Sequence, residues 1–191
     1  MKKLHPWVWI APVLFLLAVH AAEFPDSWTW DDEAPNRKAH AALEGKPMGP
    51  LYLSDWINGQ VTPADMKGKV VVVDFFATWC GPCMAAIPEN NELLKKYKDK
   101  GLMFVGVCTS DAGQDQLPKV AKAKSIQYPV ARDPDLKTEK AWAVSYYPTY
   151  AVIDRKGIVR AIGVQPDYVE KVVEKLLKEP APTTAATAPK T

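Results

Sequence analysis

Three cysteines carry most of the chemistry that this chain of 191 residues could perform. Cys80 and Cys83 have two residues between them in the run Trp79-Cys80-Gly81-Pro82-Cys83, and Cys108 stands alone. Three cysteines are too few for a scaffold held together by disulfides, whereas a close pair can form, break and exchange one. The sequence therefore indicates cysteine chemistry at residues 80 and 83, and Cys108 is expected to be a small apolar core residue.

A Cys-x-x-Cys pair can also be half of a zinc site, which needs further cysteine or histidine ligands. The histidines are His5, His20 and His40, and all three are expected outside the core of strands and helices. No second cysteine pair exists in the sequence. The composition favours redox chemistry over metal binding, and we expect neither a metal ion nor an organic cofactor.

The position of the pair, after a strand and at the start of a helix, suggests why its first thiol is reactive. At a helix start the backbone N–H groups lack internal partners, and the peptide dipoles sum to a partial positive charge. We therefore expect the pKa of Cys80 to fall below the free value of about 8.5. Cys80 is predicted to be the exposed thiol that attacks a substrate disulfide, and Cys83 the shielded thiol that resolves the mixed disulfide.

Asp74 interrupts a run of valines and phenylalanines six residues before Cys80. Burial in such a strand disfavours the charged carboxylate, so its pKa is expected to be raised. Strongly shifted groups cluster at functional sites, which favours a role in the chemistry. The alternative is a purely structural aspartate at a strand end, partly exposed to water.

The elements that must position these residues alternate between strand and helix. Residues 70–76 form a continuous β-branched and aromatic run, typical of a strand covered on both faces. Residues 82–98 have a helical pattern, in which Pro88 is expected to cause a kink. The remaining predictions are strands at 102–108, 128–131, 149–154 and 158–162, a turn at 155–157, and helices at 115–125, 136–143 and from Pro166 onward. This alternation predicts an α/β sandwich with a mixed central sheet.

The motifs of this chain resemble those of the thioredoxin-fold proteins. The resemblance lies in Val73-Asp74-Phe75-Phe76-Ala77-Thr78-Trp79-Cys80-Gly81-Pro82-Cys83 with Pro88 after it, and Tyr147-Pro148-Thr149 is similar to the family's cis-proline loop. The lead-in at 68–73 and an extra helix–strand segment at 115–135 are more similar to the exported TlpA/ResA branch. The resemblance covers about residues 46–178 and implies a three-layer sandwich, with a central mixed β-sheet flanked by helices.

The same resemblance implies roles for residues around the pair. Pro148 is expected in a cis peptide beside the cysteines, with its loop pairing with the substrate chain; an ordinary trans proline is the alternative. Asp74 is expected to help deprotonate Cys83. The implied catalytic residues are Cys80, Cys83 and Asp74, and the implied substrate-binding residues are Trp79, Gly81, Pro82, Tyr147, Pro148 and Thr149.

Two positions depart from the family pattern. Many TlpA/ResA proteins carry a glutamate in the helix after the cysteine pair, where this chain has Ala86. Thioredoxins often have a lysine on the next strand near the buried acid, and residues 102–108 contain none. The resemblance therefore leaves open which groups assist Asp74.

The start of the chain has the composition of an export signal. Lys2 and Lys3 precede an apolar run at 7–19, and Val19-His20-Ala21 resembles a cleavage site, so residues 1–21 are predicted to be a signal peptide. The apolar run is shorter than the roughly 20 residues of a membrane-spanning helix, although an uncleaved membrane anchor is the alternative. Export implies a periplasmic or other extracytoplasmic compartment, where disulfides persist.

The remaining segments divide around one domain. Residues 22–45 are predicted to be a linker or a loosely attached N-terminal arm, whose Trp28 and Trp30 are expected to fold back on the domain. Residues 46–178 are the predicted thioredoxin-like domain. Residues 179–191, rich in proline, alanine and threonine, are predicted to be a disordered tail.

These observations predict an enzyme that exchanges or reduces disulfides in exported client proteins. Its partners would be those clients and a membrane or soluble thiol electron donor, and by resemblance cytochrome c maturation is one pathway. Membrane contact is expected only if the N-terminal segment is uncleaved. The net charge of +2 falls to zero without Lys2 and Lys3, so no nucleic acid partner is expected.

Two other functions, a binding module and a peroxidase, fit the sequence less well. A redox-inert binding module would not need the intact cysteine pair and Pro148. A peroxidase of the peroxiredoxin type needs a Pro-x-x-x-Thr/Ser-x-x-Cys pattern, which is absent around Cys80 and Cys108.

Overall fold

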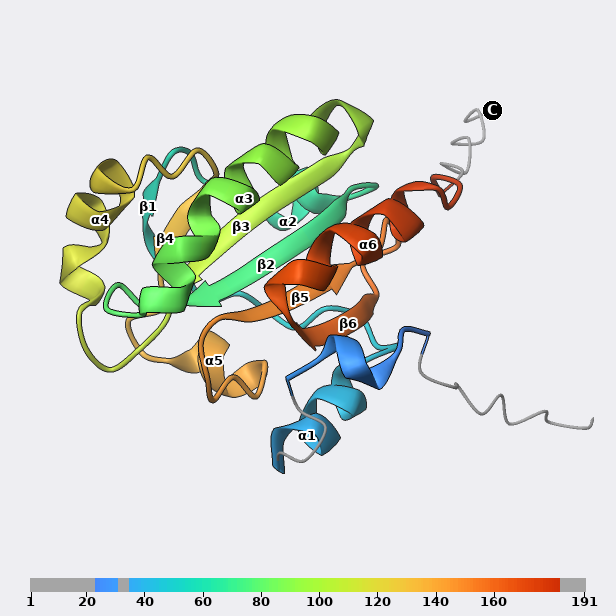
Figure 1. Ribbon diagram of the computed structural model, residues 1–191, viewed down its shortest axis with the longest axis horizontal. Helices are drawn as coiled ribbons and strands as arrows, with labels where there is room; N and C mark the ends of the chain where they lie inside the picture. The colour runs from blue at the N-terminus through green and yellow to red at the C-terminus, as the bar shows by residue number, and fades with distance from the viewer. Residues whose placement is uncertain (1–22, 31–34, 183–191) are drawn as a thin grey trace, which may run out of the picture.

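The computed structural model describes residues 23–30 and 35–182 of the chain (Figure 1). A six-stranded mixed sheet has the order β1-β4-β3-β2-β5-β6. β2 pairs in parallel with β3, and β3 with β4, whereas β1, β5 and β6 run antiparallel to their neighbours. The strands are Ser54–Ile57 (β1), Val70–Phe76 (β2), Leu102–Cys108 (β3), Val130–Arg132 (β4), Thr149–Ile153 (β5) and Val159–Val164 (β6).

Helical segments cover both faces of the sheet, which makes the molecule a three-layer α/β sandwich (Figure 1). Side chains of α3, α4 and α6 belong to the apolar cluster on one face, and α1, α2 and the residues after α5 contribute to the cluster on the other. The α-helices are Pro35–Leu43 (α1), Pro63–Met66 (α2), Gly81–Tyr97 (α3), Leu117–Ala123 (α4), Lys137–Ala141 (α5) and Pro166–Leu177 (α6). Short 3-10 helices are Asp26–Trp28 (η1), Lys98–Lys100 (η2) and Gln114–Gln116 (η3).

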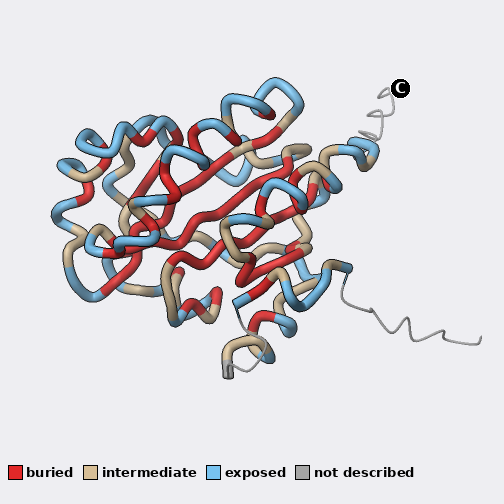
Figure 2. The backbone as a smooth tube through the Cα atoms, viewed as in Figure 1, coloured by how far each residue is buried: buried red, intermediate tan, exposed pale blue. Residues whose placement is uncertain are grey.

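β2 lies at the centre of the sheet, and all of its residues are buried (Figure 2). Successive side chains of a strand point to opposite faces. Val70, Val72 and Phe76 accordingly join the cluster under α3 and α6, whereas Val71, Val73 and Phe75 join the other cluster. Asp74 therefore points to the face that α3 covers.

The predicted order of strands and helices is confirmed, with shifts at several ends. β2 and β3 span the predicted residues, and the turn after β5 joins it to β6 as an antiparallel pair. The helix predicted at 115–125 begins as η3 and continues as the shorter α4, and β4 starts two residues later than predicted. Pro88 lies inside α3, which continues to Tyr97 because its Ile87, Asn90 and Leu93 are buried against the sheet.

The prediction of a loosely attached arm before residue 46 is wrong where the structure describes it. Thr29 forms an antiparallel bridge with Val164, and α1 contacts β6. His40, predicted to lie outside the core, is fully buried, with its Nε2 3.1 Å from the carbonyl oxygen of Ala143. The helix α1 has nine residues, and its apolar residues are mostly alanines, so its sequence carries no strong apolar stripe.

The prediction that the disordered tail begins at residue 179 is wrong for Glu179 itself. The Glu179 carboxylate accepts hydrogen bonds from the Arg160 guanidinium at 2.9 Å, so this residue is fixed to β6. Residues 183–191 and the predicted signal peptide at 1–21 lie outside the described residues. Within the described part of the chain, no helix is long and apolar enough to cross a membrane.

Candidate active site

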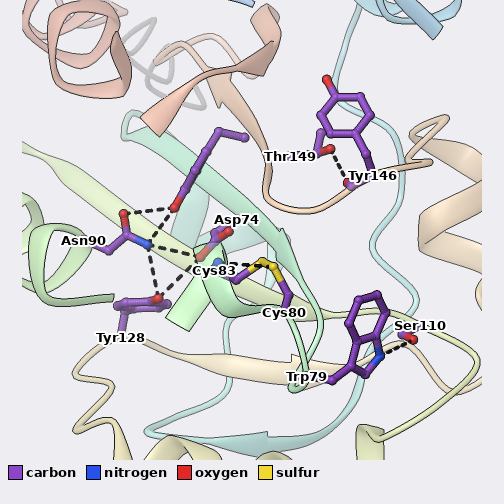
Figure 3. Close-up of a disulfide and its surroundings, with 10 residues drawn as sticks. Asp74, Trp79, Cys80, Cys83, Asn90, Ser110, Tyr128, Tyr146 and Thr149 are labelled. Carbon is purple, nitrogen blue, oxygen red and sulfur yellow. Dashed lines mark hydrogen bonds between the residues drawn. A yellow bond between two sulfur atoms is a disulfide. The ribbon is translucent and has the colours of Figure 1, made fainter. Parts of the chain in front are cut away.

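Cys80 and Cys83 form a disulfide at the N-terminus of α3 (Figure 3). Their Cα atoms are 5.3 Å apart. Cys80 is the N-cap of the helix, and its Sγ accepts a hydrogen bond from the backbone N–H of Cys83 at 3.1 Å. The first turn of α3 thus supplies an N–H donor and the positive end of the helix dipole to the Cys80 sulfur, as the sequence predicted.

The prediction that Cys80 is exposed is wrong for this disulfide-bonded state. Cys80 is 4% exposed and Cys83 is 2% exposed. The Cys80 side chain turns toward the helix start, where it bonds to the Cys83 sulfur and receives the Cys83 N–H. The accessible part of the site is instead formed by its neighbours, since Gly81 and Pro82 are exposed and Trp79 is 62% exposed.

Trp79 is held in its exposed position by contacts from both sides. Its indole Nε1–H donates to Ser110 Oγ at 3.1 Å, and its ring meets Tyr147 edge-on with centroids 5.8 Å apart. The preceding Thr78 donates from its hydroxyl to the carbonyl of Gly113 at 2.7 Å. The loop after β3 therefore supports the tryptophan, a role for Ser110 that the sequence analysis missed.

The loop before β5 contains the predicted cis peptide, between Tyr147 and Pro148. Thr149 begins β5, pairs in register with Phe75, and donates from its hydroxyl to the carbonyl of Tyr146 at 2.7 Å. Pro148 and Thr149 are buried, and Tyr147 is partly buried. The contact between Tyr147 and Trp79 places this loop next to the cysteine pair.

Tyr147 is itself fixed by the carboxylate of Glu139 in α5. The Tyr147 hydroxyl donates to Glu139 Oε2 at 2.5 Å, and the same oxygen accepts from Thr109 Oγ1 at 3.0 Å. Burial and the Glu139 carboxylate raise the pKa of Tyr147. The tyrosine therefore stays neutral and donates its proton to Glu139, which holds the ring against Trp79.

Asp74 is buried, as the sequence predicted, and the alternative of a partly exposed strand end is wrong. The residue is 2% exposed, and burial raises the pKa of its carboxyl to about 7, a shift that a hydrogen bond from Tyr128 opposes. The Asp74 Oδ2 atom accepts from Asn90 Nδ2 at 3.2 Å and from the Tyr128 hydroxyl at 3.4 Å. Asp74 Oδ1 is buried and has no hydrogen-bond partner among the described residues.

Asn90 and the tyrosines around Asp74 were missed by the sequence analysis. One signal was present, because Asn90 follows Cys83 by seven residues and so shares its face of α3, where an amide stands in an otherwise apolar stripe. The tyrosines gave no such signal, since buried aromatic residues are common in strands.

Cys108 packs as a small core residue, as predicted. It is fully buried opposite Phe76 in the pairing of β2 with β3, and burial raises the pKa of its thiol to about 12. Such a thiol stays protonated at neutral pH and is a poor nucleophile.

The surface of the described residues has two large hollows, and neither is lined by Cys80 or Cys83. A groove of about 1050 Å³ is lined by Leu51, Trp56, Met66 and other residues that include none of the predicted site. A smaller hollow of about 510 Å³ adjoins the site, because Ser110, the partner of Trp79, lines it.

A reversible disulfide at a helix start, supported by a strand that begins after a cis-proline, is the arrangement of the thioredoxin-fold thiol–disulfide oxidoreductases. The fold and the site together therefore place this chain in that class of enzymes.

Comparison with known proteins gives the family. The chain belongs to the Redoxin family, whose model matches residues 31–177. It is 31% identical over 135 residues to the thiol-disulfide oxidoreductase ResA of Bacillus cereus, covering 71% of this chain and 72% of that protein. It is 36% identical over 141 residues to the protein DipZ of Mycobacterium tuberculosis, covering 68% of this chain and 20% of that protein.

Solved structures show the same fold. A thiol:disulfide interchange protein of the thioredoxin family from Chlorobium tepidum matches with a TM-score of 0.59 and 28% identity, covering 70% of this chain and 99% of that one. The relatives and the fold together show a thioredoxin-fold protein of the TlpA/ResA type, as the sequence motifs predicted, and an oxidoreductase.

Proposed function

We propose that this oxidoreductase is exported and that it reduces or exchanges disulfides in exported client proteins. The observation that carries the proposal is the Cys80–Cys83 disulfide at the start of α3, beside the loop of Pro148. A disulfide in that position can accept or give up two electrons without any other cofactor. The basic start and short apolar run of residues 1–21 support export, after which the pair would act in an oxidising compartment.

In the reducing direction the reaction has two exchange steps. The Cys80 thiolate attacks one sulfur of the client disulfide, and the other client sulfur leaves as a thiolate. The Cys83 thiolate then attacks the Cys80 sulfur, which forms the intramolecular disulfide and releases the second client thiolate. The client gains two electrons, the enzyme loses two, and a separate thiol donor must reduce the Cys80–Cys83 disulfide again.

The residues around the pair are proposed to bind the client backbone and to assist the exchange. Trp79, Gly81 and Pro82 present an exposed surface, and the loop of Tyr147, Pro148 and Thr149 borders it through the contact of Tyr147 with Trp79. Asp74 is proposed to accept the proton of Cys83, because its carboxyl, with a pKa of about 7, can exchange a proton near neutral pH.

Reduction is the proposed net direction. Gly81 and Pro82 form the dipeptide of the reducing thioredoxins that the sequence resembles. Thioredoxin has a reduction potential of about −270 mV, whereas strong oxidants of the fold lie near −120 mV. Equilibration with glutathione buffers measures this value, and a potential above roughly −180 mV would reverse the proposed direction.

A reduction assay with dithiothreitol tests the proposed function. The protein should accelerate the reduction of an insulin disulfide, Cys80→Ser should abolish the acceleration, and Cys108→Ser should keep it because that thiol is buried. Full acceleration by Cys80→Ser would overturn the proposal.

A further inference from the structure

Four buried polar side chains from four segments of the chain meet beside the disulfide (Figure 3). Asp74 comes from β2, Asn90 from α3, Tyr128 from the segment before β4, and Tyr150 from β5. All are at most 5% exposed. A polar cluster in an apolar core costs free energy unless its groups are paired, so its geometry calls for an explanation.

The hydrogen bonds that reach Asp74 all end on one oxygen of its carboxyl. Asn90 Nδ2 and the Tyr128 hydroxyl both donate to Asp74 Oδ2. Asn90 is held in turn by Tyr150, since Asn90 Nδ2 donates to the Tyr150 hydroxyl at 3.0 Å, and that hydroxyl donates to Asn90 Oδ1 at 3.3 Å. Asp74 Oδ1, by contrast, is buried with no partner among the described residues.

The unpaired oxygen belongs to the carboxyl that lies between Asn90 and the disulfide (Figure 3). Asn90 and Cys83 share one face of α3, two helical turns apart, and both are buried toward β2. An acceptor left open on that face can take a proton from the neighbouring thiol, directly or through one water.

We propose that Asn90 and Tyr128, with Tyr150 behind Asn90, are positioning residues that anchor Asp74 by Oδ2 and leave Oδ1 free to accept the proton of Cys83. This inference rests on the proposed function and names the groups that assist its buried acid. In the resolving step the Cys83 thiol passes its proton to Asp74 Oδ1. The resulting Cys83 thiolate attacks the Cys80 sulfur, and the bond from Cys80 to the client breaks.

The cluster supplies groups that assist Asp74 in place of the two charged residues that many relatives have and this chain lacks. Ala86 offers no carboxyl, and β3 offers no lysine near Asp74. A lysine would attract the carboxylate with a full charge and lower its pKa, whereas the amide and hydroxyls are neutral donors that fix its orientation. Neutral donors thus hold the acid while it remains half-protonated near neutral pH.

The groups that act on this cluster are few. Tyr128 and Tyr150 have their pKa values raised by burial and by the charge of Asp74, so both stay protonated donors in the working pH range. Glu89 on α3 is the other acid whose charge acts on Tyr150. The other buried titratable side chains of the apolar cluster on this face are Cys80, Cys83, Cys108 and Tyr97.

The pH dependence of the resolving step tests the proposal. The mixed disulfide of the full chain with a fluorescent disulfide peptide is formed, and the release of the peptide is followed by stopped flow over a range of pH. Loss of the Tyr128 hydroxyl removes a donor that stabilises the carboxylate, so Tyr128→Phe should move the midpoint of release upward by about one pH unit. Tyr150→Phe should give a smaller shift in the same direction, because it acts through Asn90.

Tyr97→Phe is the matched control, because it removes a largely buried tyrosine hydroxyl that binds Glu170 and Glu174 at the other end of α3. It should leave the midpoint in place. In an Asp74→Asn background, Tyr128→Phe should have no further effect on the midpoint. An unchanged midpoint in Tyr128→Phe, or an equal slowing at every pH, would overturn the positioning role. Absence of any disulfide exchange by the unmodified protein would instead contradict the proposed function.

Discussion

At the residue scale, three groups near the disulfide stand in very different surroundings. Cys108 is buried in the sheet, and burial raises its pKa to about 12, although a backbone hydrogen bond with Thr78 and the charge of Arg132 act in the opposite direction. Asp74 is buried beside neutral donors, and its pKa rises to about 7. Cys80 stands at the N-terminus of α3, where an N–H group already points at its sulfur. Burial thus keeps the Cys108 thiol protonated, whereas the helix start is expected to lower the pKa of the Cys80 thiol.

The Cys80 thiol of the reduced protein is expected to ionise below the free value of about 8.5, because the helix start stabilises its thiolate. Titration of thiolate absorbance at about 240 nm should show one group ionising below about pH 8.5, and this step should vanish in Cys80→Ser. Cys108 should not interfere, since its thiol ionises only at high pH. A Cys80 pKa of about 8.5 or higher would contradict the role of the helix start.

The buried carboxyl of Asp74 should make stability depend on pH. Its pKa is about 7 in the folded protein against an ordinary value of 3.8. Between these values the folded state binds more protons than the unfolded state, so the free energy of unfolding falls as pH rises. Asp74→Asn removes this loss and should gain stability over the unmodified protein above about pH 7, by at most about 4 kcal/mol.

Urea unfolding at about pH 5 and about pH 8 checks this expectation. The stability difference between Asp74→Asn and the unmodified protein should move in favour of the variant at the higher pH. Glu92→Gln changes an exposed acid of α3 that lies away from the cluster. It is the control and should show no such trend. A difference that stays constant with pH would show that Asp74 is not held neutral by burial.

At the element scale, the sequence predicted the segments with long apolar patterns and missed those held by a few specific contacts. β2, β3 and α6 have runs or stripes of buried residues, so their type and extent were predictable. β1 and α2 are only four residues long, and α1 buries a histidine instead of an apolar stripe. Their positions depend on contacts with distant strands, which local patterns do not contain.

The packing of the N-terminal segment on α6 can be tested with two tryptophans. Trp28 stacks on Tyr168 with ring centroids 5.2 Å apart, whereas Trp30 is 55% exposed. Trp28→Ala should lower the free energy of unfolding by about 2 kcal/mol, because it removes a stacked, partly buried ring. Trp30→Ala should change it by less than about 0.5 kcal/mol. If denaturant unfolding showed as small a change for Trp28→Ala as for Trp30→Ala, the segment would not be part of the folded domain.

At the scale of the whole molecule, the fold brings residues from four distant segments of the chain together beside the disulfide. The cysteine pair could be predicted from its local spacing, and the cis-proline loop from its resemblance to a motif of the thioredoxin-fold proteins. The cluster around Asp74 could not, because Tyr128 and Tyr150 reach it from segments 54 and more residues away in the chain. Sequence patterns therefore located the reactive atoms, and the structure was needed to find what holds them.

The central claim is that Cys80 attacks a client disulfide and Cys83 releases the client. If Cys83 is absent, the mixed disulfide on Cys80 has no resolving thiol and should accumulate. Cys80→Ser should trap almost nothing, because Cys83 lies inside the first turn of α3, behind the N-cap position of Cys80. Cys108→Ser should behave like the unmodified protein, since its thiol is buried and protonated.

The most direct measurement expresses these three variants with the complete N-terminal segment, quenches the cells with acid and separates the proteins on non-reducing gels. New high-mass bands are expected for Cys83→Ser alone. A reducing agent should remove these bands, and mass spectrometry should identify them as mixed disulfides with exported clients. Bands of equal strength in Cys80→Ser, or the loss of the Cys83→Ser bands when Cys108 is also replaced, would contradict this expectation.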